Sequence, residues 1–405
     1  MLFVRTSSLV FLALPALAQT DAGVSKALEG LPAEVLPHVR LAPETSLHSM
    51  DAEDPLAAAV HFASAMTGDD ELRNRCLMRA GEVAIMRGRT GLAREVVSKI
   101  TDHRAAVLLS SLAEAAGASD AKRATEWWEL AAQMAKLVKP AAVDEVASRL
   151  VVSGHALRLP PQRIAPWFQA ITDPWTRFST GTEVTAVTAA REGSFDLLAY
   201  RQERQNLKRG LPAPGLLQAA RRLLASAAGQ KTSPDRARQF VEAAQEILAD
   251  SHVVHAELVV EAATQLFDAG FEDLARDAMN AVQGQLGGPP DEVARLHARM
   301  AMLWQKRGLA PRMHDLLTQG EQQARTLEKM HQPFCLAWYG MAWRQVGDET
   351  RGSVLLVQAA ESAWNHPNPR IQRLGAFEIS LCHAILSQSL PPNVAKVLHQ
   401  IDGRK

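Results

Sequence analysis

From Pro55 onward, apolar residues recur every three or four positions in stretches rich in Ala, Leu, Glu and Arg. This spacing is typical of amphipathic helices, and these residues are strong helix formers. Stretches in which Val, Ile, Thr or aromatic residues alternate with polar ones, as in a strand, are nearly absent. The pattern therefore predicts an all-α fold for residues 55–402.

Glycines interrupt the helical pattern at intervals of 29 to 41 residues, and each lies between stretches of helix length. These glycines are Gly88, Gly117, Gly154, Gly193, Gly229, Gly270, Gly308 and Gly347. A period in this range is typical of solenoids, in which each helix pair buries its apolar face against its neighbours. The recurrence predicts an elongated, right-handed α-solenoid of about eight to ten antiparallel helix hairpins.

Small and bulky residues also recur at fixed distances around several of these glycines. The fullest set is Tyr339, Gly340, Trp343, Gly347, Gly352, Leu356 and Ala359. In this arrangement the chain resembles the tetratricopeptide (TPR) family, with degenerate repeats spaced more widely than the family's 34 residues. The resemblance implies that small residues lie where the two helices of a hairpin cross, with Trp128, Trp304 and Trp343 filling the core. The units at Gly154 and Gly229 fit the pattern poorly, and generic helix pairs of the HEAT type are the alternative.

The first eighteen residues have the features of a secretory signal peptide. Arg5 precedes an apolar run of about ten residues, and Ala16 and Ala18 form a small-x-small cleavage site. The run is far shorter than the roughly 20 residues that span a bilayer. We therefore expect cleavage after Ala18, no stable membrane anchor, and a mature chain in the periplasm or outside the cell.

Residues 19–54 contain several prolines and belong to an acidic stretch. From Gln19 to Glu71, ten Asp and Glu residues face only two Lys and Arg residues. Closely spaced prolines allow only short helices, so this segment is predicted to be an acidic N-terminal arm before the repeat domain of residues 55–402. Proline clusters at 158–176 and 205–215 mark possible joints within that domain.

Charge and cysteine content exclude several classes of protein. The chain has 44 Lys plus Arg, 44 Asp plus Glu and a pI near 7.2, so no overall positive field favours nucleic acid. The one basic cluster has no aromatic stacking platform and is interpreted as a solvated helix face; it consists of Arg201, Arg204, Lys208, Arg209, Arg221 and Arg222. Three cysteines, Cys76, Cys335 and Cys382, are too few for a disulfide framework and are predicted to be packing residues, although a Cys335–Cys382 bridge is conceivable.

No complete catalytic or cofactor motif is present. His252 and His255 have the spacing of a helical metal-binding pair, but a nearby third ligand is missing, so no metal site is assigned. Nucleophile elbows, phosphate-binding loops and dinucleotide fingerprints are also missing. We therefore predict no cofactor and assign no catalytic residue. Whether the chain is an enzyme stays open, with a non-catalytic role favoured.

An alternative comes from aromatic residues next to a carboxylate. Trp127, Trp128 and Glu129, together with the segment from Trp167 to Trp175, could stack against a sugar. Secreted α/α-toroid glycoside hydrolases and polysaccharide lyases are also built of helix pairs. Only 5% of the chain is aromatic, which is low for a sugar-binding cleft.

The favoured function is a secreted or periplasmic, non-catalytic scaffold that binds a protein or peptide partner. Repeat solenoids present extended concave surfaces for this purpose. If the resemblance to TPR proteins holds, the groove is lined by the first helix of each hairpin. Counting back from Gly308 and Gly347 gives the expected binding residues: Arg295, Met302, Gln305, Lys306, Phe334, Met341, Arg344 and Gln345.

Overall fold

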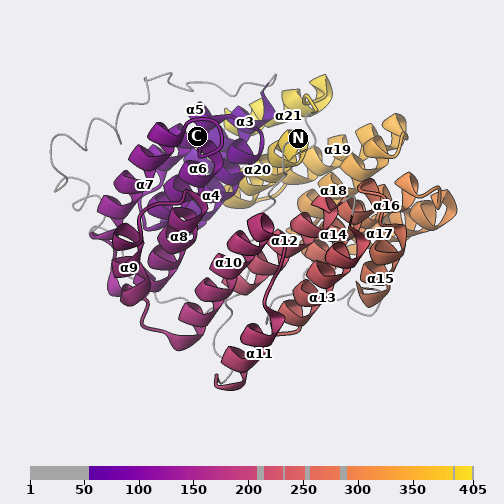
Figure 1. Ribbon diagram of the computed structural model, residues 1–405. Coiled ribbons are helices and arrows are strands. Elements are labelled where there is room, and N and C mark those ends of the chain that lie inside the picture. Colours follow the sequence, from indigo (N-terminus) through magenta and orange to yellow (C-terminus); the bar gives the residue numbers. More distant parts are fainter. Residues whose placement is uncertain are drawn as a thin grey trace. The chain divides into compact units, whose positions relative to one another are not determined.

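The computed structural model describes residues 54–207, 214–230, 233–250, 256–282, 290–385 and 388–403. Within these ranges every regular element is helical: there are nineteen α-helices and one short 3-10 helix (Figure 1). The predicted all-α class is confirmed. The signal peptide and nearly all of the acidic arm lie outside the described residues, as do His252, His255, Lys208 and Arg209.

The helices follow one another with short connections. Those up to residue 205 are α3 (Pro55–Ser64), α4 (Asp70–Met86), α5 (Thr90–Lys99), α6 (Arg104–Ala116), α7 (Ala121–Ala135), η1 (Pro140–Ala142), α8 (Val143–Ala156), α9 (Pro161–Ala170), α10 (Pro174–Glu192) and α11 (Leu197–Gln205). Those that follow are α12 (Pro214–Gly229), α13 (Pro234–Asp250), α14 (Ala256–Asp268), α15 (Glu272–Val282), α16 (Pro290–Lys306), α17 (Ala310–Thr326), α18 (Gln332–Gln345), α19 (Glu349–Trp364), α20 (Pro369–Ile385) and α21 (Pro392–Asp402).

Proline and aspartate mark the beginnings of many helices. Eight of the α-helices start at a proline, whose fixed φ suits the first helical position and whose missing N–H is not needed there. Asp54 caps α3 by accepting hydrogen bonds from the backbone N–H groups of Leu56 and Ala57. In the proline cluster at 158–176, α9 ends and α10 begins, so no long helix crosses it.

The chain divides into two compact units. Among the described residues, unit 1 comprises 85–258 and 262–280, and unit 2 comprises 54–84, 259–261 and 281–403. The proline clusters at 158–176 and 205–215, which the sequence marks as possible joints, both fall in unit 1.

Unit 1 is built from helix pairs whose first helices contact one another in chain order. Helix α6 packs on α7, α8 on α9 and α12 on α13. Helix α6 also packs on α8, α8 on α10 and α10 on α12 (Figure 1). The helices α6, α8, α10 and α12 thus form a continuous layer, which we call the first-helix layer of unit 1.

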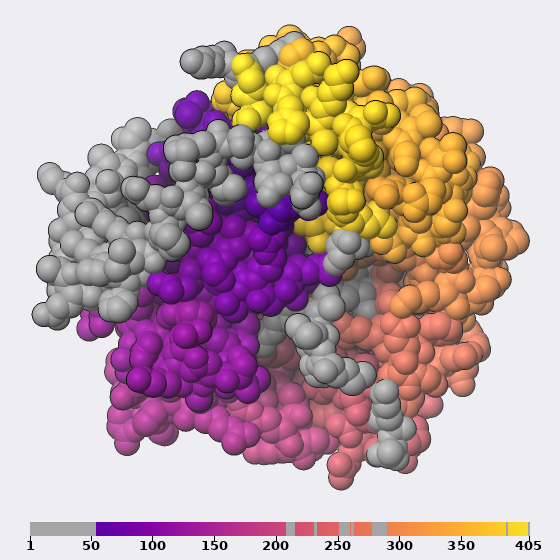
Figure 2. All heavy atoms as spheres, turned by 90° about the horizontal axis from the view of Figure 1, so that it is seen from above, coloured from indigo at the N-terminus to yellow at the C-terminus, as the bar shows by residue number. Residues whose placement is uncertain are grey.

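Unit 2 has the same kind of layer and an additional contact. Helix α16 packs on α18, and α18 packs on α20, while α17 and α19 pair with α16 and α18. Helix α3 packs along α20, and Arg79 of α4 donates two hydrogen bonds to the carboxylate of Glu378 in α20. The indigo N-terminal helices accordingly adjoin the yellow C-terminal ones in Figure 2.

This contact corrects one prediction. An elongated stack keeps its first and last hairpins far apart, whereas α3 and α20 pack together within unit 2. The prediction of an elongated stack is therefore wrong in this respect. Local periodicity does not reveal it, because the contact joins residues about three hundred positions apart, such as Arg79 and Glu378.

Seven of the eight turn glycines lie at helix ends, as predicted, and five of these have left-handed backbone. Gly88, Gly193, Gly270, Gly308 and Gly347 have positive φ, in the left-handed region that glycine enters at little cost. Each ends a helix and lets the chain turn back.

Among the other three glycines only Gly154 contradicts the prediction, because it does not end a helix. Gly117 follows α6 in a right-handed conformation, Gly154 lies inside α8, and Gly229 is the last residue of α12.

Close helix crossings depend on small residues, as the resemblance implies. A methyl group added at Gly352 of α19 would lie 2.6 Å from the carbonyl oxygen of Gly340 in α18, and 2.8 Å from the backbone nitrogen of Arg344. The aromatic core positions are also largely as predicted. Trp128 and Trp343 are buried, whereas Trp304 is only half-buried.

We expect Gly352→Val to lower the free energy of unfolding by about 2 kcal/mol, because the backbones of α18 and α19 must move apart. The matched control is Gly181→Val in the middle of α10, where nothing lies within 4 Å of an added methyl group. Urea titration followed by circular dichroism measures both. Equal stability losses for the two variants would contradict the close crossing.

All three cysteines are free and buried. Burial raises the pKa of Cys76 and of Cys335 to about 12, and raises the pKa of Cys382 as well. A buried thiol that stays protonated is a poor nucleophile. The predicted packing role is confirmed, and no Cys335–Cys382 bridge forms.

Candidate functional site

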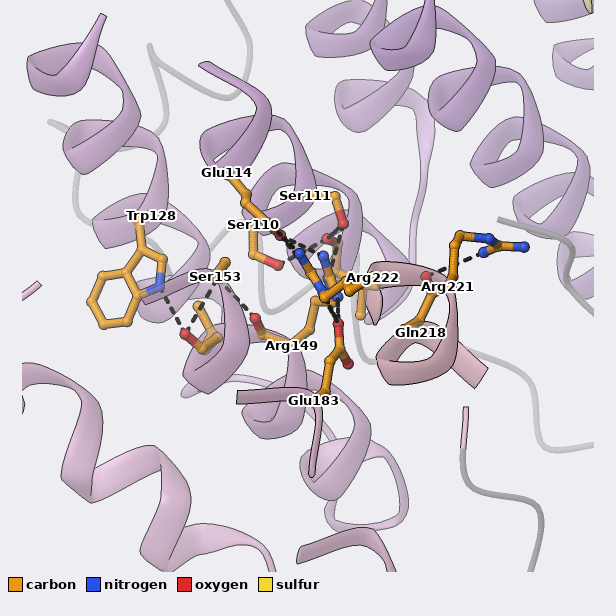
Figure 3. A network of polar contacts seen from close by, with 12 residues as sticks. Ser110, Ser111, Glu114, Trp128, Arg149, Ser153, Glu183, Gln218, Arg221 and Arg222 are labelled. Atoms are coloured by element: carbon orange, nitrogen blue, oxygen red, sulfur yellow. Dashed lines mark hydrogen bonds and ion pairs between the residues drawn. The ribbon is translucent and has the colours of Figure 1, made fainter. Parts of the chain in front are cut away.

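Four charged side chains meet in the first-helix layer of unit 1, one from each helix. They are Glu114 of α6, Arg149 of α8, Glu183 of α10 and Arg222 of α12. Figure 3 shows the two guanidinium groups lying between the two carboxylates. We call this set the four-charge network.

Each arginine of the network contacts both glutamates. Arg149 donates from Nη2 to Glu114 at 2.7 Å and from Nη1 to Glu183 at 3.1 Å. Arg222 donates from Nη1 to Glu114 at 2.9 Å, and from Nε and Nη2 to Oε1 of Glu183 at 3.1 and 3.0 Å. The remaining Nε of Arg149 donates to Ser111 at 3.1 Å. Neighbouring first helices are thereby connected by charge-assisted hydrogen bonds as well as by apolar contact.

The network is largely removed from water. Only 3% of each glutamate side chain is exposed, against 17% for Arg149 and 15% for Arg222. Burial alone would lower the pKa of Arg222, but the charges of Glu114 and Glu183 outweigh this and raise it. The network pairs two positive with two negative side chains, so it carries no net buried charge.

This arrangement is suited to positioning helices rather than to acid–base chemistry. A general acid or base needs a proton that it can exchange near neutral pH. Here both carboxylates accept hydrogen bonds from guanidinium groups, which do not lose their protons. The chemistry available to the network is therefore the binding of carboxylate by arginine, within the chain.

Sequence analysis singled out only Arg222 of these four residues. The sequence nevertheless contains a pattern from which the other three residues could have been predicted. The four residues alternate in sign and follow one another at separations of 35, 34 and 39 residues, close to the spacing of the turn glycines. A lone charge recurring at the repeat period on an apolar helix face indicates partners in successive repeats.

Comparison with known proteins adds no family. No family model, curated protein or solved structure matches this chain. The function is therefore inferred from the arrangement of the chain's own residues.

The groove residues that the sequence predicts lie in unit 2, on α16 and α18. On α16, Arg295 and Met302 are half-buried, while Gln305 and Lys306 are exposed at the end of the helix. Nε2 of Gln305 donates to the carbonyl oxygen of Val346 at 2.8 Å, which connects α16 to the residue that follows α18. These residues lie on the expected helix.

On α18, one of the four predicted groove residues is fully buried. Met341 is fully buried because α16, α17, α19 and α20 all pack around α18, so it does not face solvent. Phe334 and Gln345 are half-buried. Arg344 has a side chain only 14% exposed, and its Nε and Nη1 groups have no hydrogen-bond partner among the residues that the structure describes. A partner-binding role for the other seven residues stays a prediction.

Of the tryptophans considered for sugar stacking, Trp127, Trp128 and Trp175 are buried, whereas Trp167 is half-buried. Trp128 is in the core, and its Nε1 donates to the carbonyl oxygen of Leu150 at 3.0 Å. Trp127 is 9% exposed, and the guanidinium carbons of Arg94 and Arg123 each lie 5.9 Å from the centroid of its ring. Both indoles are therefore largely covered by the chain's own residues.

The described members of the basic cluster are mostly paired with acids. Arg201 contacts Glu246, and Arg204 contacts Asp250 while stacking on the ring of Trp175. Arg222 belongs to the four-charge network. This basic sequence segment therefore does not form a free cationic surface in the part of the chain that is described.

Two further site types find no support among the described residues. They hold no group of three or more His, Cys, Asp or Glu side chains arranged to bind a metal ion. They also include no helix that is both long enough and apolar enough to span a membrane.

Proposed function

We propose that this protein is a non-catalytic helical-repeat scaffold that binds a protein or peptide partner. The observation that carries the proposal is the ordered contact of first helices, from α6 through α12 in unit 1 and from α16 through α20 in unit 2. Such layering is typical of α-solenoids, whose repeated hairpins present extended surfaces to partners. The location that we propose, the periplasm or the cell exterior, rests on the signal sequence of residues 1–18.

The resemblance to TPR proteins supports the same proposal through details of packing. Left-handed glycines end several first helices, and Gly340 and Gly352 permit the close crossing of α18 and α19. These features favour a right-handed TPR-like superhelix. The contact between α3 and α20 is a departure from an open stack of this kind.

The alternative is a glycoside hydrolase or polysaccharide lyase of the α/α-toroid type. Retaining and inverting glycosidases use two carboxylates about 5 to 10 Å apart beside the substrate. Glu114 and Glu183 are buried carboxylates that share the same two partners. Both accept hydrogen bonds from Arg149 and Arg222. Glu129 is exposed and pairs with Arg163 at 2.6 Å. Neither arrangement leaves a carboxylate pair open to a sugar.

One experiment separates the two functions. The mature chain, residues 19–405, is immobilised and exposed to the extracytoplasmic fraction of its own cells, and the same preparation is assayed on a panel of glycans. We expect a protein to be retained in saturable amounts and no glycan to be cleaved. Turnover that is lost in Glu129→Gln or Glu183→Gln, with no retained protein, would reverse the assignment.

A further inference from the structure

Three arginines without a carboxylate partner lie close to the four-charge network. Arg158 follows the end of α8, Arg191 is next to last in α10, and Arg236 is in the first turn of α13. All three are exposed. Within the described part of the chain, none of them forms an ion pair. We call them the arginine cluster.

The backbone at Arg158 is unusual. Its φ of 58° makes it the only described non-glycine residue with a positive φ. It ends α8 in the way a glycine normally does: its N–H donates to the carbonyl oxygen of His155 at 3.1 Å, and the N–H of Leu159 donates to that of Gly154 at 3.0 Å. A side chain in this conformation is less favourable than glycine, so the turn itself gives no reason for an arginine here.

Arg191 and Arg236 bring two more guanidinium groups to the same region. Nη2 of Arg191 donates to the carbonyl oxygens of His155 and Ala156, at 3.1 and 2.6 Å, and so holds the side chain over the end of α8. A methyl group added at Gly193 would lie 3.3 Å from Nη1 of Arg236.

Within the cluster, the charge of Arg158 acts on Arg191. Burial lowers the pKa of Arg191, and the charges of Arg158 and Arg222 lower it further, against an opposing effect of Glu114. The pKa of His155 is lowered by burial and then by Arg191.

The acids nearby do not neutralise this cluster. Glu114 and Glu183 are engaged by Arg149 and Arg222 in the four-charge network. Glu192 and Asp235 neighbour Arg191 and Arg236 in sequence, but among the described residues they form no ion pair with them. The cluster therefore presents positive charge to solvent.

We infer that the arginine cluster binds an acidic segment of the protein partner, through carboxylates of Asp or Glu side chains. This inference rests on the proposed function, because it names a surface and a chemistry for the partner. The four-charge network shows that arginines in this part of unit 1 bind carboxylates through several hydrogen bonds each. Guanidinium groups match the geometry of carboxylates, and three together suit an extended chain bearing more than one.

The test uses a fluorescein-labelled peptide of alternating glutamate and glycine residues, and the full mature chain. Arg158→Gly and Arg236→Gln are each expected to weaken binding about tenfold in fluorescence anisotropy. Arg238→Gln is the matched control, since Arg238 is also exposed on α13 but two residues further on, so that it points in a different direction. It is expected to change affinity by less than about twofold.

The melting temperature of Arg158→Gly is a second readout, which distinguishes a binding role of the arginine side chain from a structural one. Glycine fits the left-handed conformation better than arginine, so the melting temperature is expected to stay the same or to rise while binding weakens. A lower melting temperature would show that the side chain stabilises the fold, and would overturn the inference.

The remaining outcomes are also decisive. Binding within about twofold of wild type for both cluster variants, or equal weakening by Arg238→Gln, would overturn the inference. So would binding of inorganic phosphate without binding of the peptide. If a native partner is captured equally by wild type and both variants, the inference fails while the proposed function stands. If wild type captures no partner and does not bind the peptide, both fail.

Discussion

Arg222→Met is expected to lower the free energy of unfolding by about 3–5 kcal/mol, because it leaves two buried carboxylates with one guanidinium group. Glu114 and Glu183 would share Arg149 alone, and a net negative charge would remain in a site where each glutamate side chain is 3% exposed. Urea unfolding monitored by circular dichroism at neutral pH measures the loss.

Two further variants separate this effect from a loss of packing. Arg163→Gln breaks the exposed ion pair with Glu129, in which 47% of each side chain is exposed, and should cost less than about 1 kcal/mol. Adding Glu183→Met to Arg222→Met removes one acid with one base, and should recover part of the stability. A loss of less than about 1 kcal/mol in Arg222→Met would mean that the network does not hold the first helices together.

Acid is expected to destabilise unit 2 through His383, by about 2 kcal/mol between pH 7.5 and pH 5. The side chain is fully buried in α20, and its Nδ1 donates to the carbonyl oxygen of Ile379 at 2.8 Å. Burial lowers the pKa of His383 to about 4, with a further contribution from the charge of Arg344.

The sign follows from the two protonation states. The unfolded chain binds the proton near pH 6.5, and the folded chain binds it only near pH 4. The full contribution of His383 to stability is therefore present above about pH 6.5 and is lost as the pH falls towards 4. His383→Leu should remove this part of the pH dependence.

The control is His297→Leu, which removes the other histidine of unit 2 whose pKa burial lowers. Nδ1 of His297 lies 2.9 Å from the hydroxyl oxygen of Tyr339, which is within hydrogen-bond distance. The His297→Leu variant therefore tests a buried histidine that has a polar side-chain partner. If wild type and His383→Leu lose the same stability between pH 7.5 and pH 5, His383 is not held neutral by burial.

Features of the fold that depend on residues close in sequence could be predicted, whereas contacts between residues far apart in sequence could not. Helix periodicity and turn glycines are local, and the all-α class and five of the left-handed turns follow from them. The close approach of Gly340 and Gly352 agrees with the resemblance to TPR proteins, which implies small residues where the two helices of a hairpin cross.

Contacts between distant segments were not predictable from local patterns. The pairing of Arg79 with Glu378 depends on packing between α4 and α20, and nothing near either residue in sequence indicates it. Met341 shows the same limit for the binding residues. Its position relative to Gly347 suggests an exposed face, but four neighbouring helices surround α18 and bury it.

The four-charge network lies between these cases. Its alternating signs at the repeat spacing are visible in the sequence, but whether Glu114, Arg149, Glu183 and Arg222 meet depends on the first helices lying side by side. The arginine cluster is harder still to predict, because Arg158, Arg191 and Arg236 come from a turn and from two helix ends. Only the folded chain shows that Arg158 has a positive φ, that its charge acts on Arg191, and that Arg236 lies beside Gly193.

The proposed function is tested most directly by a calorimetric titration of the mature chain with the purified protein that it captures from the extracytoplasmic fraction. We expect saturable binding that weakens about tenfold in Arg158→Gly and is unchanged in Arg238→Gln, with no glycan cleaved by the same preparation. Absence of saturable binding, together with glycan turnover that disappears when Glu129 or Glu183 is changed to Gln, would contradict the proposed function and assign the chain to the enzymes.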